Sequence, residues 1–148
     1  MVDRFKRFSL SVFEISRCWH KLASDVMAKY DLKGPHAIYL VVLQHNPEGL
    51  TSARLAELCG RDKADVSRAV TLMEEKGLVY REQGNAYRAK LTLTETGNQA
   101  ADHVCSRASV AVELAGKDIS DEEREIFYHA LTSITGNLRE LCREGLPK

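Results

Sequence analysis

The sequence lacks the long hydrophobic run of a membrane protein. Its longest apolar stretch, residues 37–43, is far too short to span a bilayer. The basic N-terminal residues are followed by a segment that Glu14 and Arg17 interrupt, and no small-residue cleavage site appears. We therefore expect no signal peptide and no membrane association. The 148 residues are enough for one compact domain with helical extensions.

Paired cysteines and paired histidines are missing as well. The cysteines Cys18, Cys59, Cys105 and Cys142 lie far apart in helical stretches, and no two have zinc-ligand spacing. The five histidines include no pair three or four residues apart. We expect no metal, no cofactor and no disulfide framework, and such a chain fits a reducing, cytoplasmic location.

The chain has no excess of one charge, because 21 basic side chains balance 21 acidic ones. A neutral total argues mildly against a nonspecific nucleic-acid coat, but the distribution is uneven. Residues 61–93 carry seven basic and five acidic side chains, whereas residues 94–148 carry six and ten. We also find no nucleophile–base pair, phosphate-binding loop or metal constellation, so we do not expect an enzyme.

The most informative stretch is residues 61–93. Asp62 is an N-cap type of residue, and Asp65 stands three positions later, where an acid can reach back to the cap amide. Apolar residues then recur at the spacing of one buried helix face, and polar residues occupy the opposite face. The apolar residues are Val66, Ala69, Val70 and Met73, and the polar ones are Lys63, Ser67, Arg68 and Thr71. Gly77 is expected to end this helix.

Two short strands are predicted after this helix, at about residues 78–82 and 87–93, with a turn at residues 83–86 between them. In the second strand, apolar residues that face inward alternate with polar residues that face outward. The former are Ala89, Leu91 and Leu93, and the latter are Arg88, Lys90 and Thr92. A polar-faced helix followed by a cationic hairpin is the outline of a winged helix.

Three helices are predicted before this stretch. Residues 8–26 place apolar side chains at alternating steps of four and three, which is typical of a helix packed along a near-parallel partner. An almost wholly apolar helix of about residues 35–45 is expected at the centre of the core. Thr51 can cap a helix of about residues 52–59, and residues 50–51 are a candidate strand beside the wing. The last of these helices and the polar-faced helix form a helix-turn-helix.

Two long helices are predicted after the wing. Thr94 can cap a helix that runs to about residue 115, and Ser120 with Glu123 forms a capping box before a helix of about residues 121–143. The expected fold is mainly α with a small β-hairpin wing. It has a winged helix-turn-helix head at residues 32–93 and a helical dimerisation region at residues 1–31 and 94–148. So small a head cannot bury three long apolar seams, which predicts a homodimer.

Residues 62–70 (DKADVSRAV) and 72–79 (LMEEKGLV) resemble the recognition helix and the start of the wing in the MarR family of bacterial transcription regulators. Residues 88–97 (RAKLTLTETG) resemble the end of that wing and the leucine-threonine-x-x-glycine start of the family's fifth helix. The order of helices matches along nearly the whole chain. In one departure, Ala86 stands where the family's wing usually carries an aspartate, two residues before the arginine that is Arg88 here.

This resemblance implies a homodimer of first, fifth and sixth helices that binds a pseudo-palindromic, double-stranded DNA operator. In many members a small ligand, held between the head and the dimer helices, releases the DNA. We therefore expect a transcriptional regulator, most simply a ligand-responsive repressor. Two alternatives stay open: a winged helix that contacts other proteins without DNA, and a regulator that senses oxidants through Cys18 or Cys59.

The candidate DNA-binding residues lie on three elements: Thr51, Ser52 and Arg54; Lys63, Asp65, Ser67, Arg68 and Thr71; Arg88 and Lys90. The middle group is expected in the major groove, where Arg68 forks onto a guanine or clamps a phosphate. Asp65 is either a cap partner or a base reader, and Thr51 is either a cap or a phosphate contact. The wing cations contact phosphate or the minor groove. The alternative for every group is an ordinary solvated surface.

A candidate ligand pocket lies on the first two helices. Its residues are Trp19, His20, Tyr30, His36 and Tyr39. An aromatic side chain on a helix seam more often belongs to the core than to a ligand site, so core packing is the alternative interpretation of this group. The alternative for both cysteines is a buried, unreactive thiol.

Overall fold

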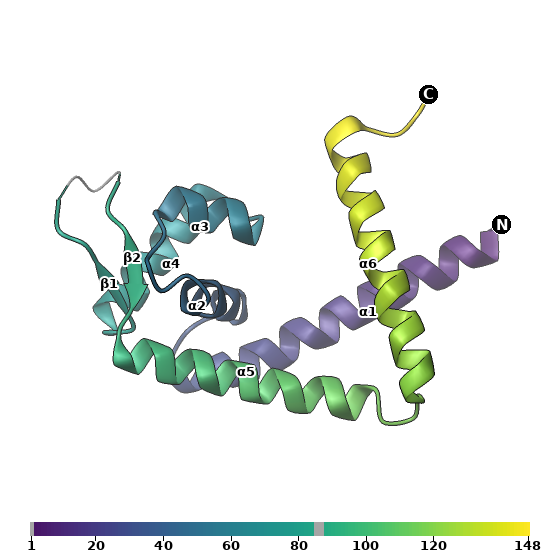
Figure 1. Cartoon of the computed structure of the whole chain (residues 1–148), viewed down its shortest axis with the longest axis horizontal. Helices are drawn as coiled ribbons and strands as arrows, with labels where there is room; N and C mark the ends of the chain where they lie inside the picture. Colours follow the sequence, from purple (N-terminus) through teal and green to yellow (C-terminus); the bar gives the residue numbers. More distant parts are fainter. Residues whose placement is uncertain (1, 85–87) are drawn as a thin grey trace. The chain divides into compact units, whose positions relative to one another are not determined.

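The computed structural model describes residues 2–84 and 88–148. Its helices and strands, in chain order, are α1 (Val2–Met27), η1 (Ala28–Tyr30), η2 (Gly34–His36), α2 (Ala37–Gln44), α3 (Ser52–Cys59), α4 (Lys63–Glu75), β1 (Val79–Arg81), β2 (Leu91–Leu93), α5 (Glu95–Ala115) and α6 (Asp121–Glu144) (Figure 1). The predicted fold, mainly α with a small hairpin, is confirmed. The chain divides into two compact units, Met1–Ser109 and Val110–Lys148.

The first unit is built around α2, as its apolar sequence predicts. In Figure 1, α2, α3 and α4 gather beside the hairpin of β1 and β2. Leu40 of α2 is fully buried in one hydrophobic cluster with side chains from each neighbouring element. The cluster includes Met27, Leu55, Val66, Val70, Leu91 and Ala101. Burial of each large apolar side chain contributes roughly 1.5–3 kcal/mol, so this cluster holds α4 firmly in place.

The wing is a two-stranded antiparallel hairpin in which Val79 pairs with Leu93 and Arg81 with Leu91. The strands are shorter than the predicted ones, although the Glu82 amide still donates to the Lys90 carbonyl at 2.9 Å. The expected strand at residues 50–51 is a single bridge, in which Leu50 and Leu91 exchange both backbone hydrogen bonds, at 3.1 and 2.8 Å. The predicted turn at residues 83–86 lies partly outside the described residues.

The start of α5 closes against the start of the wing. The Thr94 hydroxyl accepts from the Gly97 amide at 3.0 Å, which confirms the predicted cap, and donates to the Gly77 carbonyl at 2.5 Å. The Thr94 amide also donates to the Leu78 carbonyl at 3.0 Å. Residues at the end of α4, at the start of β1 and at the start of α5 are thus held together by one threonine.

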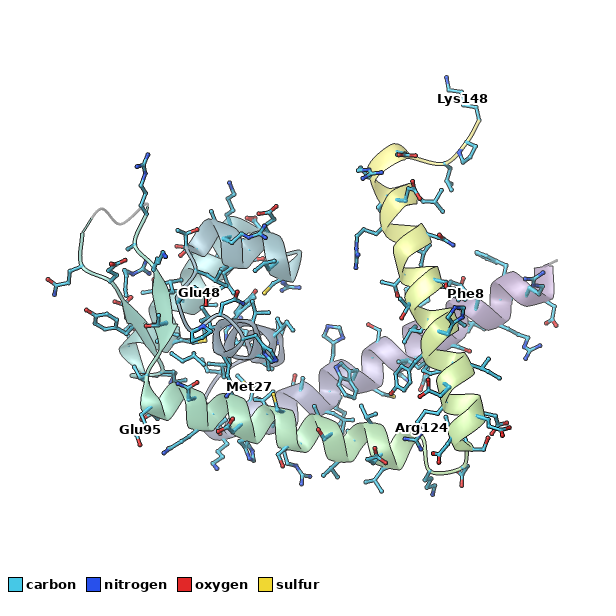
Figure 2. The ribbon with its side chains drawn as sticks, in the orientation of Figure 1. Phe8, Met27, Glu48, Glu95, Arg124 and Lys148 are labelled. Atoms are coloured by element: carbon cyan, nitrogen blue, oxygen red, sulfur yellow. The ribbon has the colours of Figure 1, made fainter. Side chains whose placement is uncertain are left out.

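The second unit contains the end of α5, a turn and α6. Ser120 and Glu123 form the predicted capping box at the start of α6. Arg124 reaches back to the turn after α5 and donates to the Gly116 carbonyl at 3.3 Å (Figure 2). None of the residues of α6, all of which the structure describes, is buried. Its apolar stripe is exposed and consists of Phe127, Leu131, Ile134, Leu138 and Leu141.

The described helices include none that is long and apolar enough to cross a membrane.

Candidate nucleic-acid interface

The α3–α4 pair has the geometry of a helix-turn-helix, and local sequence explains each boundary. Thr51 caps α3 by accepting from the Arg54 amide at 3.2 Å. Gly60 ends α3 in the left-handed region, with φ of 60°, where glycine avoids the steric cost of a side chain. Asp62 then caps α4 by accepting from the Ala64 amide at 2.9 Å. Two caps and one glycine therefore set the turn between the helices.

The helix α4 divides into the two faces that its spacing predicts. Its apolar face is buried and consists of Val66, Ala69, Val70 and Met73. The opposite face is exposed and consists of Lys63, Asp65, Ser67, Arg68 and Thr71. The Arg68 side chain is 72% exposed, so the fold leaves it available to a partner. The Thr71 hydroxyl donates to the Ser67 carbonyl at 3.0 Å, a bond within the helix.

Asp65 does not complete the capping box that its spacing suggests. Its carboxylate instead accepts from the guanidinium of Arg68, one turn further along the same face. An aspartate side chain is one methylene shorter than the glutamate or glutamine that usually reaches back to the cap amide. The cap interpretation of Asp65 is therefore wrong, and Asp62 alone caps the helix.

Arg54, near the start of α3, has a similar partner. Its guanidinium donates to Glu57 at 2.7 Å, and both side chains are more than half exposed. Ser52 and Thr51 stand beside it at the front of the helix and are half-buried. The Thr51 hydroxyl is the α3 cap, so one of its two predicted functions is observed.

The wing presents its two cations as the alternation predicts. Arg88 and Lys90 are exposed, whereas Ala89 and Leu91 between and beside them are buried. Ala86, where the family usually has an aspartate, lies outside the described residues. The wing is tied to α4 by an ion pair between Arg81 and Glu74, with 3.2 Å between Nε and the carboxylate.

Sequence reasoning missed this Arg81–Glu74 pair. The two residues are seven positions apart on different elements, so helix periodicity does not relate them. The only local signal is that opposite charges flank the glycine that ends α4. The pair matters for the site because it fixes the base of the wing relative to the exposed face of α4.

The candidate pocket residues occupy different surroundings. Tyr39 is fully buried in the core, whereas Trp19 and His20 are exposed on α1. Tyr30 packs edge-on against His103, with 6.0 Å between ring centroids. His36 stacks on Tyr39 at 5.9 Å. Burial lowers the pKa of His36, and the positive charges of Lys33 and Arg61 lower it further.

The two candidate redox cysteines also differ in their surroundings. Cys59 is half-buried beside the core, and this burial raises the pKa of its thiol, against a smaller lowering by Arg61. A raised pKa leaves less of the nucleophilic thiolate. Cys18 is exposed on α1, with its sulfur 3.8 Å from a Glu14 carboxylate oxygen.

A sequence profile of the MarR family matches residues 30–86, which run from the last residue of η1 to the segment between β1 and β2. This segment contains α2 and the α3–α4 pair that forms the helix-turn-helix described above. The match covers 57 of the 148 residues and shows that this segment is similar to the MarR family. The elements around it form a winged helix-turn-helix fold.

Solved structures of transcription regulators, two of them described as MarR regulators, share its fold over most of the chain. A MarR transcriptional regulator from Methanosarcina mazei Go1 is 17% identical, with a TM-score of 0.82 over 92% of this chain and 99% of that one. A putative MarR family transcriptional regulator from Listeria monocytogenes, complexed with 26mer DNA, is 22% identical, with a TM-score of 0.79 over 93% of this chain and 95% of that one. MepR, a transcription regulator of the Staphylococcus aureus multidrug efflux pump MepA, is 24% identical, with a TM-score of 0.69 over 88% of this chain and 98% of that one. No curated protein matches in sequence.

Proposed function

We propose that this protein is a MarR-family regulator: a cytoplasmic, dimeric repressor that binds a pseudo-palindromic DNA operator through α4 and is released by a small molecule. The observation that carries the proposal is the division of α4 into a buried face and an exposed polar face. The buried face holds the helix rigidly, and the exposed face offers Lys63, Ser67 and Arg68 to a partner. The DNA complex of the Listeria relative supports the choice of partner.

The dimensions of α4 suit the major groove of DNA. That groove is about 12 Å wide and admits one α-helix, and its base edges carry a distinct pattern of donors and acceptors. Lys63 and Arg68 supply donors there, and exposed Arg88 and Lys90 on the wing supply charge for a nearby phosphate or the minor groove. Thr51, Ser52 and Arg54, at the front of α3, are the proposed phosphate contacts of this helix.

The proposed dimer rests on apolar helix faces that the single chain leaves exposed. Phe8, Trp19 and Leu22 on α1 are each 44–47% exposed, and the stripe of α6 is exposed along its length. Large exposed apolar surfaces mark sites of association. A second copy packed against the apolar faces of the helices in residues 1–31 and 94–148 would bury these faces and present two α4 helices to one operator.

The proposed effector site is the region of His36 and Tyr39. The Nδ1 atom of His36 is buried and makes no hydrogen bond within the described residues. A buried polar atom of this kind costs free energy until a partner satisfies it, and a bound ligand is one such partner. Release of the operator by a ligand, with loss of that response in His36→Phe, is the expected result.

The DNA-binding proposal is tested by selecting bound fragments from a random DNA pool and measuring their affinity by gel shift. We expect wild-type protein to enrich a two-fold symmetric site and Arg68→Ala to bind it at least roughly tenfold more weakly. Arg107→Ala removes an exposed arginine from α5 and serves as the control. No enrichment by wild-type protein at low salt, or equal binding by Arg68→Ala, would contradict the proposal.

A further inference from the structure

The ion pair between Asp65 and Arg68 lies on the exposed face of α4. Arg68 donates to the Asp65 carboxylate from a terminal guanidinium nitrogen, within one turn of the same helix. The Arg68 side chain is 72% exposed and the Asp65 side chain is 50% exposed. So exposed a pair contributes little to folding stability, because water screens both charges. The ion pair therefore does not account for an acid at this position, and the place of Asp65 in the first turn of α4 adds only a small stabilisation through the helix dipole.

Capping does not account for Asp65 either. The cap of α4 is Asp62, whose side chain accepts from the Ala64 amide. An acid on the face that the proposed function turns toward DNA repels phosphates and so weakens binding to any sequence. An aspartate here is thus unfavourable for indiscriminate binding and needs another function.

The geometry of the pair supplies that function. A guanidinium carries five N–H donors in a rigid planar fork. The contact with Asp65 uses a donor on one terminal nitrogen and, among the described residues, leaves donors on the other nitrogens free. Free donors in one plane match the O6 and N7 acceptors of a guanine in the major groove. A side chain already held by a neighbour also loses less conformational freedom on binding.

We propose that Asp65 is a specificity-determining residue that positions Arg68 to read a guanine and weakens binding to sites without that guanine. The inference rests on the proposed DNA-binding function and refines it at one base pair. Asp65 acts through Arg68 and is therefore a positioning residue. Its negative charge disfavours the wrong sequence, where Arg68 gains no base contact in return.

The test compares four proteins on the operator selected by the wild type and on operators in which each G·C pair is changed to A·T. The proteins are wild type, Asp65→Asn, Arg68→Ala and the double variant. The control is Glu14→Gln, which removes one negative charge from a similarly exposed acid–arginine pair on α1, Glu14 with Arg17 at 2.7 Å. Thermal unfolding of all variants monitors any loss of structure.

We expect Asp65→Asn to lower the preference for G·C at one position in each half-site by roughly tenfold, and to bind non-operator DNA as tightly as the wild type or more tightly. In the Arg68→Ala background the same change should have no further effect on that preference. Glu14→Gln should leave the preference intact, and the unfolding midpoints of Asp65→Asn and Glu14→Gln should agree closely.

An unchanged preference in Asp65→Asn at every base pair would overturn this inference and leave the proposed function intact. The inference would also be overturned if Arg68→Ala weakened binding to every sequence by the same factor. A loss of that kind, with a dependence of log affinity on log salt concentration that is smaller by about one, identifies Arg68 as a phosphate contact. A wild-type protein that binds none of the DNA would overturn both.

Discussion

Gly97, in the first turn of α5, lies directly against the carbonyl group of Leu78. A Cβ atom at position 97 would be 1.9 Å from that oxygen, well inside van der Waals contact. The same oxygen accepts from the Thr94 amide, so it cannot move away without loss of that bond. Only glycine allows α5 to begin this close to the wing.

We predict that Gly97→Ala destabilises the protein by roughly 1–3 kcal/mol or more, because backbone must shift to admit the methyl group. Gly136→Ala in α6 is the matched control, since a Cβ there meets nothing within 4 Å. It should raise stability by roughly 0.5–1 kcal/mol, as alanine does in a helix interior. Urea unfolding measures both. Equal effects of the two changes would contradict this account of the α5 start.

The caps of α4 give a second prediction. Asp62→Ala should cost about 1 kcal/mol of the free energy of unfolding, because the Ala64 amide loses its acceptor. Asp65→Ala should cost only a few tenths, since its carboxylate bonds to an exposed arginine and not to the helix end. Asp62→Asn, which keeps an acceptor, should behave like the wild type. A larger loss of stability in Asp65→Ala than in Asp62→Ala would contradict this account and support Asp65 as part of a capping box.

Acid sensitivity should depend partly on His36. Its pKa in the folded protein lies below the ordinary value of about 6.5, so the unfolded chain binds this proton more readily. The free energy of unfolding should therefore fall as pH drops below about 6.5. For the His36→Gln variant it should fall less steeply between pH 7.5 and 5. His129→Gln, an exposed histidine on α6, is the control. Identical pH profiles of unfolding for His36→Gln and wild type would refute the assignment.

The proposed dimer predicts a mass in solution of twice 16.6 kDa. Leu138→Glu places a charge in the apolar stripe of α6 and should weaken association by roughly 100-fold or more, since a buried unpaired charge costs several kcal/mol. Thr132→Glu adds the same charge on the opposite side of α6 and should leave association unchanged. Sedimentation equilibrium distinguishes the two. A wild-type monomer at micromolar concentration would refute the dimer.

Helix spacing and caps were enough to predict most of the fold. The buried face of α4, the Thr51 and Ser120 caps and the central position of α2 depend on residues within a few positions of one another. The resemblance to MarR regulators added the helix order. Contacts between distant residues were harder to predict. The Leu78–Gly97 approach and the Arg81–Glu74 pair depend on how the wing packs against α4 and α5.

The candidate site shows the same division. Spacing predicted which side chains of α4 are exposed, because one buried stripe determines the opposite face. It did not predict that Asp65 would pair with Arg68, since an acid three residues after a cap has two partners within reach. The buried position of Tyr39 and the exposed position of Trp19 follow from tertiary packing, which periodicity in α1 and α2 does not describe.

Methylation interference on the selected operator tests most directly whether α4 reads the major groove. Methylation of guanine N7 blocks that groove and leaves the phosphates and the minor groove free. We predict that the bound fraction is depleted of guanines methylated at two places about one helical turn, roughly 34 Å, apart. In Arg68→Ala the depletion should weaken at one guanine in each half-site. An identical methylation pattern in bound and free DNA would contradict the account.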